Sequence, residues 1–92
     1  MRQETAEQIA QEALIWLANE DDLLPIFLGA TGAASNDIRS AAQDLVFLGS
    51  VLEFLLMDDA WIIRFCDATG HPPTRLQEAR YALPGGKDVH WT

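Results

Sequence analysis

The chain has 92 residues, of which 49% are hydrophobic and 22% are charged, so we expect one globular domain rather than a disordered chain. Fourteen acidic and six basic residues give a formal net charge of −8. Because this charge repels phosphate backbones and anionic lipids, we expect no nucleic-acid partner and no membrane partner; a basic partner, or no partner, fits the charge better.

Cysteine content and the lengths of the apolar stretches indicate the cellular compartment in which the protein is expected. Cys66 is the one cysteine of the chain, so no internal disulfide can form. The first four residues lack the apolar run of a secretory signal. The longest apolar stretch, Leu45 to Met57, covers about 13 residues, whereas crossing a bilayer takes roughly 18 to 20. These features predict a cytoplasmic protein.

The N-terminal half predicts three helices. Thr5, followed by Gln8, has the pattern of a capping box, which opens a first helix running to Asn19. The acidic residues 20–22 are expected to be N-caps of a second helix. That helix is expected to reach Leu28 and to be closed by a left-handed Gly32, and a third helix is predicted over residues 35–42.

The C-terminal half predicts three more helices. The strongly apolar segment Leu45 to Met57 should be a buried core helix. Asp58 or Asp59 is expected to cap a fifth helix that ends at Gly70. A sixth helix should open at Pro72 and Pro73, where a missing N–H costs nothing, and should end before residues 84–86. The fold class is therefore predicted to be all-α, a compact bundle of five to six helices.

The domain prediction is a single helical domain over residues 1–84 and a C-terminal tail over residues 85–92. Within the domain, the sequence can be aligned with itself so that Phe27 pairs with Phe65. This alignment pairs Phe27-Leu28-Gly29-Ala30-Thr31-Gly32 with Phe65-Cys66-Asp67-Ala68-Thr69-Gly70. We call this shift the repeat offset. At the same shift, the order of a helix, an acidic break and a second helix in the first half matches the same order in the second half. We interpret the match as two pseudo-repeated three-helix units; the alternative is coincidence, since helical proteins reuse Leu, Ala and Asp.

No residue pattern predicts a catalytic, cofactor or metal site. The acidic clusters 20–22 and 58–59 lack the ligand spacing of a calcium loop and fall where helices need caps, so we expect them to be caps; the alternative is that they bind a metal ion or a basic partner. Cys66 and His71 lack a group that would orient them as nucleophile and base, and Cys66 lies beside the expected buried stripe. We therefore expect no enzymatic activity and no cofactor.

Two apolar side chains are expected on the surface. Ile15 falls on the polar side of the first helix, and Ile63 is displaced from the buried stripe of the fifth. Scattered exposed apolar residues are normal; the functional alternative is a patch that binds a partner. In the tail, His90 and Trp91 either fold back onto the domain or are presented to a partner.

Several segments together resemble a known family. They are Trp16-Leu17-Ala18, Asp21-Asp22, Phe27-Leu28, Thr31-Gly32, Phe47-Leu48-Gly49, Val51-Leu52, Phe54-Leu55, Leu83-Pro84-Gly85-Gly86 and His90-Trp91-Thr92. Across essentially the whole chain, they resemble the alphaproteobacterial family known as domain of unknown function 3572. The resemblance implies a bacterial cytosolic origin and an all-helical fold, and it implies no activity.

Two functions remain open from the sequence. The first is a non-catalytic protein-interaction or regulatory module of the bacterial cytosol, with Ile15, Ile63, His90 and Trp91 as candidate partner-binding residues. The alternative is a small-molecule binding protein with an apolar pocket between the two halves, lined by aromatic side chains: Trp16, Phe54, Trp61 and Phe65. The partner and the oligomeric state are not predicted.

Overall fold

The computed structural model describes residues 1–32 and 42–83. The elements in these two ranges are all α-helices: α1 (Gln3–Ala18), α2 (Leu24–Thr31), α4 (Leu45–Leu56), α5 (Asp59–Thr69) and α6 (Pro73–Ala82). Five helices and no strand within the described residues confirm the predicted all-α fold. The helix predicted over residues 35–42 lies, up to residue 41, outside the described part of the chain.

The start of α1 differs from the prediction. The helix begins at Gln3, and Arg2 is its N-cap residue without a side-chain capping bond. Thr5 is therefore inside the first turn, and the predicted capping box is wrong. The N-terminal turn is exposed, so water can satisfy its free N–H groups and no capping side chain is required.

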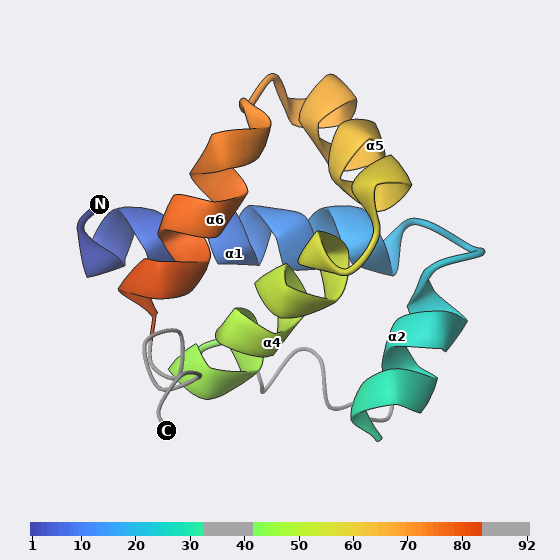
Figure 1. The fold of residues 1–92 in the computed structure, drawn as a ribbon. Coiled ribbons are helices and arrows are strands. Elements are labelled where there is room, and N and C mark those ends of the chain that lie inside the picture. The colour runs from blue at the N-terminus through green and yellow to red at the C-terminus, as the bar shows by residue number, and fades with distance from the viewer. Residues whose placement is uncertain (33–41, 84–92) are drawn as a thin grey trace.

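The core forms because α1 and α4 each carry a continuous apolar side. In α1, the buried positions recur at helical spacing: Ala6, Ile9, Ala10, Ala13, Leu14 and Leu17. Asp44 caps α4 through its Oδ1 atom, which accepts from Val46 N at 2.9 Å and from Phe47 N at 3.3 Å. As predicted, α4 is a buried core helix. It packs against α1, α2, α5 and α6 (Figure 1).

Two glycines end helices as predicted. Gly32 follows α2 with a φ of 75°, and Gly70 follows α5 with a φ of 83°, which are left-handed conformations that favour glycine. Each glycine N–H bonds to a carbonyl of the preceding helix at 2.8 Å. The preceding threonines also match, because Thr31 and Thr69 donate to the carbonyls four residues earlier at 2.9 and 2.8 Å.

The connections between α1 and α2 (residues 19–23) and between α4 and α5 (residues 57–58) share a backbone pattern. Each contains amides that bond back to carbonyls three or four residues earlier, and the bonds correspond at the repeat offset. The pairs are Asn19 N to Trp16 O and Met57 N to Phe54 O, Glu20 N to Leu17 O and Asp58 N to Leu55 O, and Leu24 N to Glu20 O and Ile62 N to Asp58 O. The two connections therefore share these backbone hydrogen bonds.

Candidate interaction surface

Two adjoining hollows are lined by residues of α5 and α6, and the first hollow also by residues of α4. The helices α5 and α6 diverge from residues 70–72 (Figure 1). The first hollow has a volume of about 290 Å³ and is lined by Glu53, Leu56, Asp59, Ile62, Gln77, Arg80 and Tyr81. The second has a volume of about 320 Å³ and is lined by Asp59, Ile62, Ile63, Pro73, Thr74 and Gln77. Because they share Asp59, Ile62 and Gln77, we treat them as one surface and call it the α5–α6 groove.

The groove combines exposed apolar side chains with polar ones. Ile63 is 55% exposed and Tyr81 is 61% exposed, whereas Ile62 is buried and belongs to the core. Thr74 and Gln77 are exposed on α6. An apolar surface with polar groups beside it is the composition expected of a site that binds another molecule.

An ion pair forms one end of the groove. The Arg80 guanidinium donates to Glu53 Oε2 from Nε at 3.2 Å and from its terminal nitrogen at 2.6 Å. The Arg80 side chain is only 14% exposed, and that of Glu53 is 59% exposed. The pair therefore joins α4 to α6 and leaves mainly the carboxylate open to solvent.

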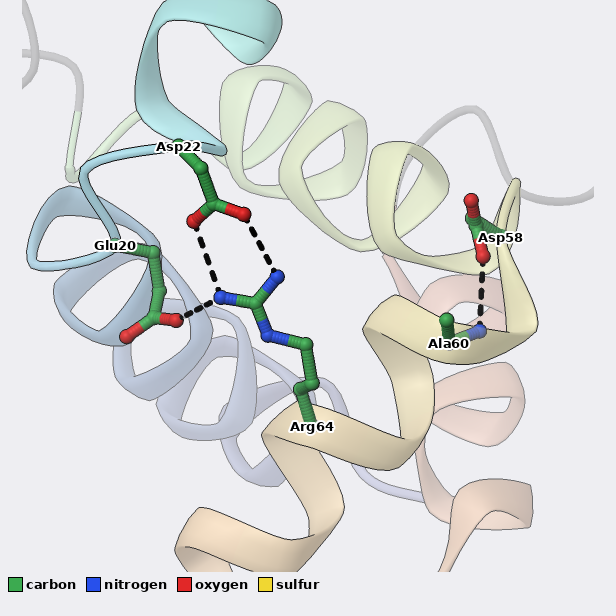
Figure 2. Close-up of polar contacts among 5 residues, drawn as sticks. All are labelled: Glu20, Asp22, Asp58, Ala60 and Arg64. Carbon is green, nitrogen blue, oxygen red and sulfur yellow. Dashed lines mark hydrogen bonds and ion pairs between the residues drawn. The ribbon is translucent and has the colours of Figure 1, made fainter.

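The start of α5 positions the acidic side chain shared by both hollows. Asp58 caps the helix, because its Oδ1 atom accepts from Ala60 N at 2.8 Å (Figure 2). Asp58 thus confirms the predicted cap. The next residue, Asp59, lies in the first helical turn and lines both hollows. Capping by Asp58 leaves the Asp59 carboxylate available to the groove.

The opposite side of α5 is tied to the α1–α2 connection by Arg64. Its guanidinium donates to both Asp22 oxygens at 3.0 and 3.1 Å and also to Glu20 (Figure 2). The guanidinium carbon lies 5.9 Å from the centre of the Trp16 ring, a cation–π distance. We call Arg64, Glu20, Asp22 and Trp16 the Arg64 clamp.

The Arg64 clamp corrects the prediction that residues 20–22 cap α2. Leu23 is the N-cap residue of α2, and no side chain caps that helix. The bidentate bond from a guanidinium is strong and directional, which gives Asp22 a better partner than backbone N–H groups. These hydrogen bonds lower the pKa of the Asp22 carboxyl below its ordinary 3.8 and, together with those to Glu20, raise the pKa of Arg64.

The clamp also determines where Ile63 lies. Adjacent residues of a helix point about 100° apart. With Arg64 directed toward the α1–α2 connection and Phe65 in the core, Ile63 lies on the side next to α6, where it lines the groove with Pro73.

The predicted partner-binding residues are not all in one place. Ile15 is 65% exposed and Ile63 is 55% exposed, so both predictions of exposure are confirmed. Ile63 lines the groove, whereas Ile15 lies on α1, away from the residues that line these hollows. His90 and Trp91 lie outside the described residues.

Sequence reasoning missed most of the groove, including Thr74, Gln77, Arg80 and Tyr81, and it favoured a capping role for Asp59 over binding of a basic partner. These side chains come together because α5 and α6 diverge, and the divergence depends on how α5 packs on α4 and how α6 packs on α1 and α4. Only Ile63 carried a signal that helical periodicity could detect.

Cys66 and His71 have separate structural surroundings. Cys66 is buried, and burial, assisted by the negative charge of Asp67, raises the pKa of its thiol. His71 Nε2 lies 2.6 Å from Glu12 Oε1, and its ring stacks on Phe65 at a centroid distance of 6.0 Å. A buried thiol with a raised pKa is a poor nucleophile.

The aromatic side chains predicted to line a pocket between the halves pack against one another. The Trp16 ring meets the Phe65 ring edge-on at 5.6 Å, and Phe54 stacks on Trp61 at 4.6 Å. This packing gives no support to a ligand pocket lined by the four rings. Within residues 1–32 and 42–83, no group of three or more His, Cys, Asp or Glu side chains is arranged to hold a metal ion.

None of the helices described by the structure is long and apolar enough to cross a membrane.

Comparison with known proteins identifies a family. Residues 3–86 match the model of a family described as "Protein of unknown function (DUF3572)". No curated protein and no solved structure is significantly similar to the chain. The match covers the described helices and the whole α5–α6 groove.

Proposed function

The chain belongs to the DUF3572 family, and from its fold and surface we propose that it is a non-catalytic protein-interaction module that docks a segment of a protein partner in the α5–α6 groove. The observation that carries this proposal is the pair of adjoining hollows with Ile63 and Tyr81 exposed beside them. Docking would remove these apolar side chains from water, which stabilises a complex by about 25 cal/mol for each Å² of apolar area buried.

Support for a non-catalytic role comes from the surroundings of the candidate reactive groups. Cys66 is a buried thiol, and His71 is engaged by Glu12. Arg64 and Arg80 hold helices together through carboxylates. Each of these groups therefore has a role in packing or in joining helices.

Origin and setting are also part of the proposal. We place the protein in the bacterial cytosol, in keeping with a single, buried cysteine. The net charge of −8 disfavours nucleic acid and anionic membranes as partners. We further propose internal duplication, supported by the glycine caps and backbone hydrogen bonds that correspond at the repeat offset.

Site-specific photo-cross-linking tests the docking proposal. Benzoylphenylalanine is introduced in place of Thr74, which is exposed and lines the groove, and separately in place of Ile15 as the matched exposed control on α1. After irradiation of intact source cells, we expect a discrete protein adduct from position 74 that excess unlabelled wild-type protein suppresses. The same adduct from both positions, or no adduct from position 74, would contradict the proposal.

A further inference from the structure

The α5–α6 groove follows about two turns of α6. Its lining residues on α6 run from Pro73 to Tyr81, which at about 1.5 Å per residue is roughly 12 Å, the length of about two turns of a partner helix. A helix lying in a groove presents apolar residues at positions i, i+3, i+4 and i+7. The exposed side chain of Tyr81 lines one hollow and that of Ile63 lines the other, so such a stripe could contact both.

The charges around the groove are predominantly negative. Glu53, Asp59 and Arg80 are its charged lining residues, so two carboxylates face one guanidinium. Arg80 is already bound to Glu53, and its side chain is largely buried. Asp59 forms no ion pair with the residues that the structure describes, and it borders both hollows.

This charge distribution discriminates among possible occupants. A second copy of the chain would also carry a charge of −8, and an acidic segment would place like charges beside Asp59. A lysine or arginine side chain would instead meet Asp59 while its methylene groups covered Ile63.

From these observations we infer that the occupant of the α5–α6 groove is a basic amphipathic helix of a partner protein, with its apolar stripe on Ile63 and Tyr81 and a cation at Asp59. The inference rests on the proposed docking function and specifies the chemistry of the partner.

Three synthetic peptides test the inference with the full chain. The first carries Leu at i, i+3, i+4 and i+7 with Lys elsewhere; the second is a scrambled sequence of the same composition; the third has Glu in place of Lys. Binding is followed by amide chemical shifts at about 0.15 M salt, where attraction between distant exposed charges is screened. We expect only the first peptide to shift the amides of Ile63, Thr74 and Gln77.

A pair of charge-removing variants provides the matched control. Asp59→Asn removes the groove carboxylate, and Asp67→Asn removes an exposed carboxylate of the same helix that lines neither hollow. We expect Asp59→Asn to weaken binding of the first peptide about three- to fivefold, the size of an exposed charge pair, and Asp67→Asn to leave it unchanged. Equal weakening by both variants would overturn the assignment of Asp59.

The outcomes separate this inference from the docking function. Equal binding of the scrambled or the acidic peptide, or shifts confined to other helices, would overturn the basic amphipathic occupant. A competed cross-link from position 74 together with no binding of the first peptide would contradict the partner chemistry and leave the docking function supported. Failure of both experiments would contradict both proposals.

Discussion

The α1–α2 and α4–α5 connections share backbone hydrogen bonds, but their carboxylates bind different partners. At corresponding positions, Glu20 directs its carboxylate to Arg64, whereas Asp58 directs its carboxylate to the first turn of α5. Asp22 joins Glu20 on Arg64, and Ala60 takes the corresponding place in the second connection (Figure 2). In this chain, the carboxylates that bind Arg64 do not cap α2, whereas the Asp58 carboxylate caps α5.

The two uses of the carboxylates together set the position of α5. Asp58 fixes where the helix begins, and the Arg64 clamp attaches its opposite side to the α1–α2 connection. With the beginning and the rotation of α5 set in this way, Ile63 and Asp59 lie toward α6. The cap and the clamp therefore act together with the burial of Ile62 and Phe65 to place the groove residues of α5.

The largest expected effects test whether the two halves are also equivalent in their cores. Phe27 and Phe65 correspond at the repeat offset, and both are fully buried. Each contacts two other rings. We expect Phe27→Ala and Phe65→Ala each to lower the free energy of unfolding by about 3 to 5 kcal/mol, measured by urea denaturation.

A large inequality between the two phenylalanine variants would show that the halves are not equivalent in packing. If an alanine variant does not fold, Phe→Leu at both positions provides the same comparison, because it leaves a smaller cavity.

A smaller effect tests the different uses of Asp58 and Glu20. Asp58→Ala removes the N-cap of α5 and should lower the free energy of unfolding by about 0.5 to 2 kcal/mol at any salt concentration. Glu20→Ala removes a contact with Arg64, so its effect should be smaller and should decline as salt is added. Urea denaturation at low and high salt measures both.

Asp58→Asn is the control for the cap, because asparagine also offers a capping oxygen and should retain most of the stability. A salt-sensitive loss in Asp58→Ala, or a salt-independent loss in Glu20→Ala, would mean that the two connections do not differ as described.

Many of these structural features could be predicted from the sequence, but the contact between Arg64 and Asp22 could not. Periodicity and capping patterns predicted the buried α4 helix, the Asp58 cap, the left-handed Gly32 and Gly70, and the exposure of Ile63. All of these depend on residues close together in the chain.

The parts that were missed depend on distant residues. Arg64 lies 42 residues from Asp22, and their contact arises only when α5 packs beside the α1–α2 connection. The same is true of Asp59 and Gln77, which border one groove from two helices. Spacing along one helix carries no information about such pairings.

The smallest expected effect concerns pH. Arg64 lowers the folded-state pKa of Asp22 below its unfolded value, so the carboxylate stabilises the fold above the unfolded pKa. This contribution is lost as the pH falls through the folded pKa. We expect wild type to exceed Asp22→Asn in urea midpoint at about pH 6 and the difference to disappear well below pH 3.8.

Carboxyl carbon NMR titration provides the control for the pH prediction. The pKa of Asp22 should return toward its ordinary 3.8 in Arg64→Met. An unchanged Asp22 titration in that variant would show that Arg64 does not lower the pKa.

The most direct test of the central claim, that the α5–α6 groove is the docking surface, compares Ile63→Glu with Ile15→Glu. Both residues are exposed, so both variants should retain wild-type helical content and thermal stability, measured by circular dichroism. Quantitative capture of the partner identified by cross-linking should fall at least tenfold for Ile63→Glu and remain unchanged for Ile15→Glu, because the first change replaces an apolar contact of the groove with a charged group that is costly to desolvate. Capture that survives in Ile63→Glu, or that is lost instead in Ile15→Glu, would contradict the account.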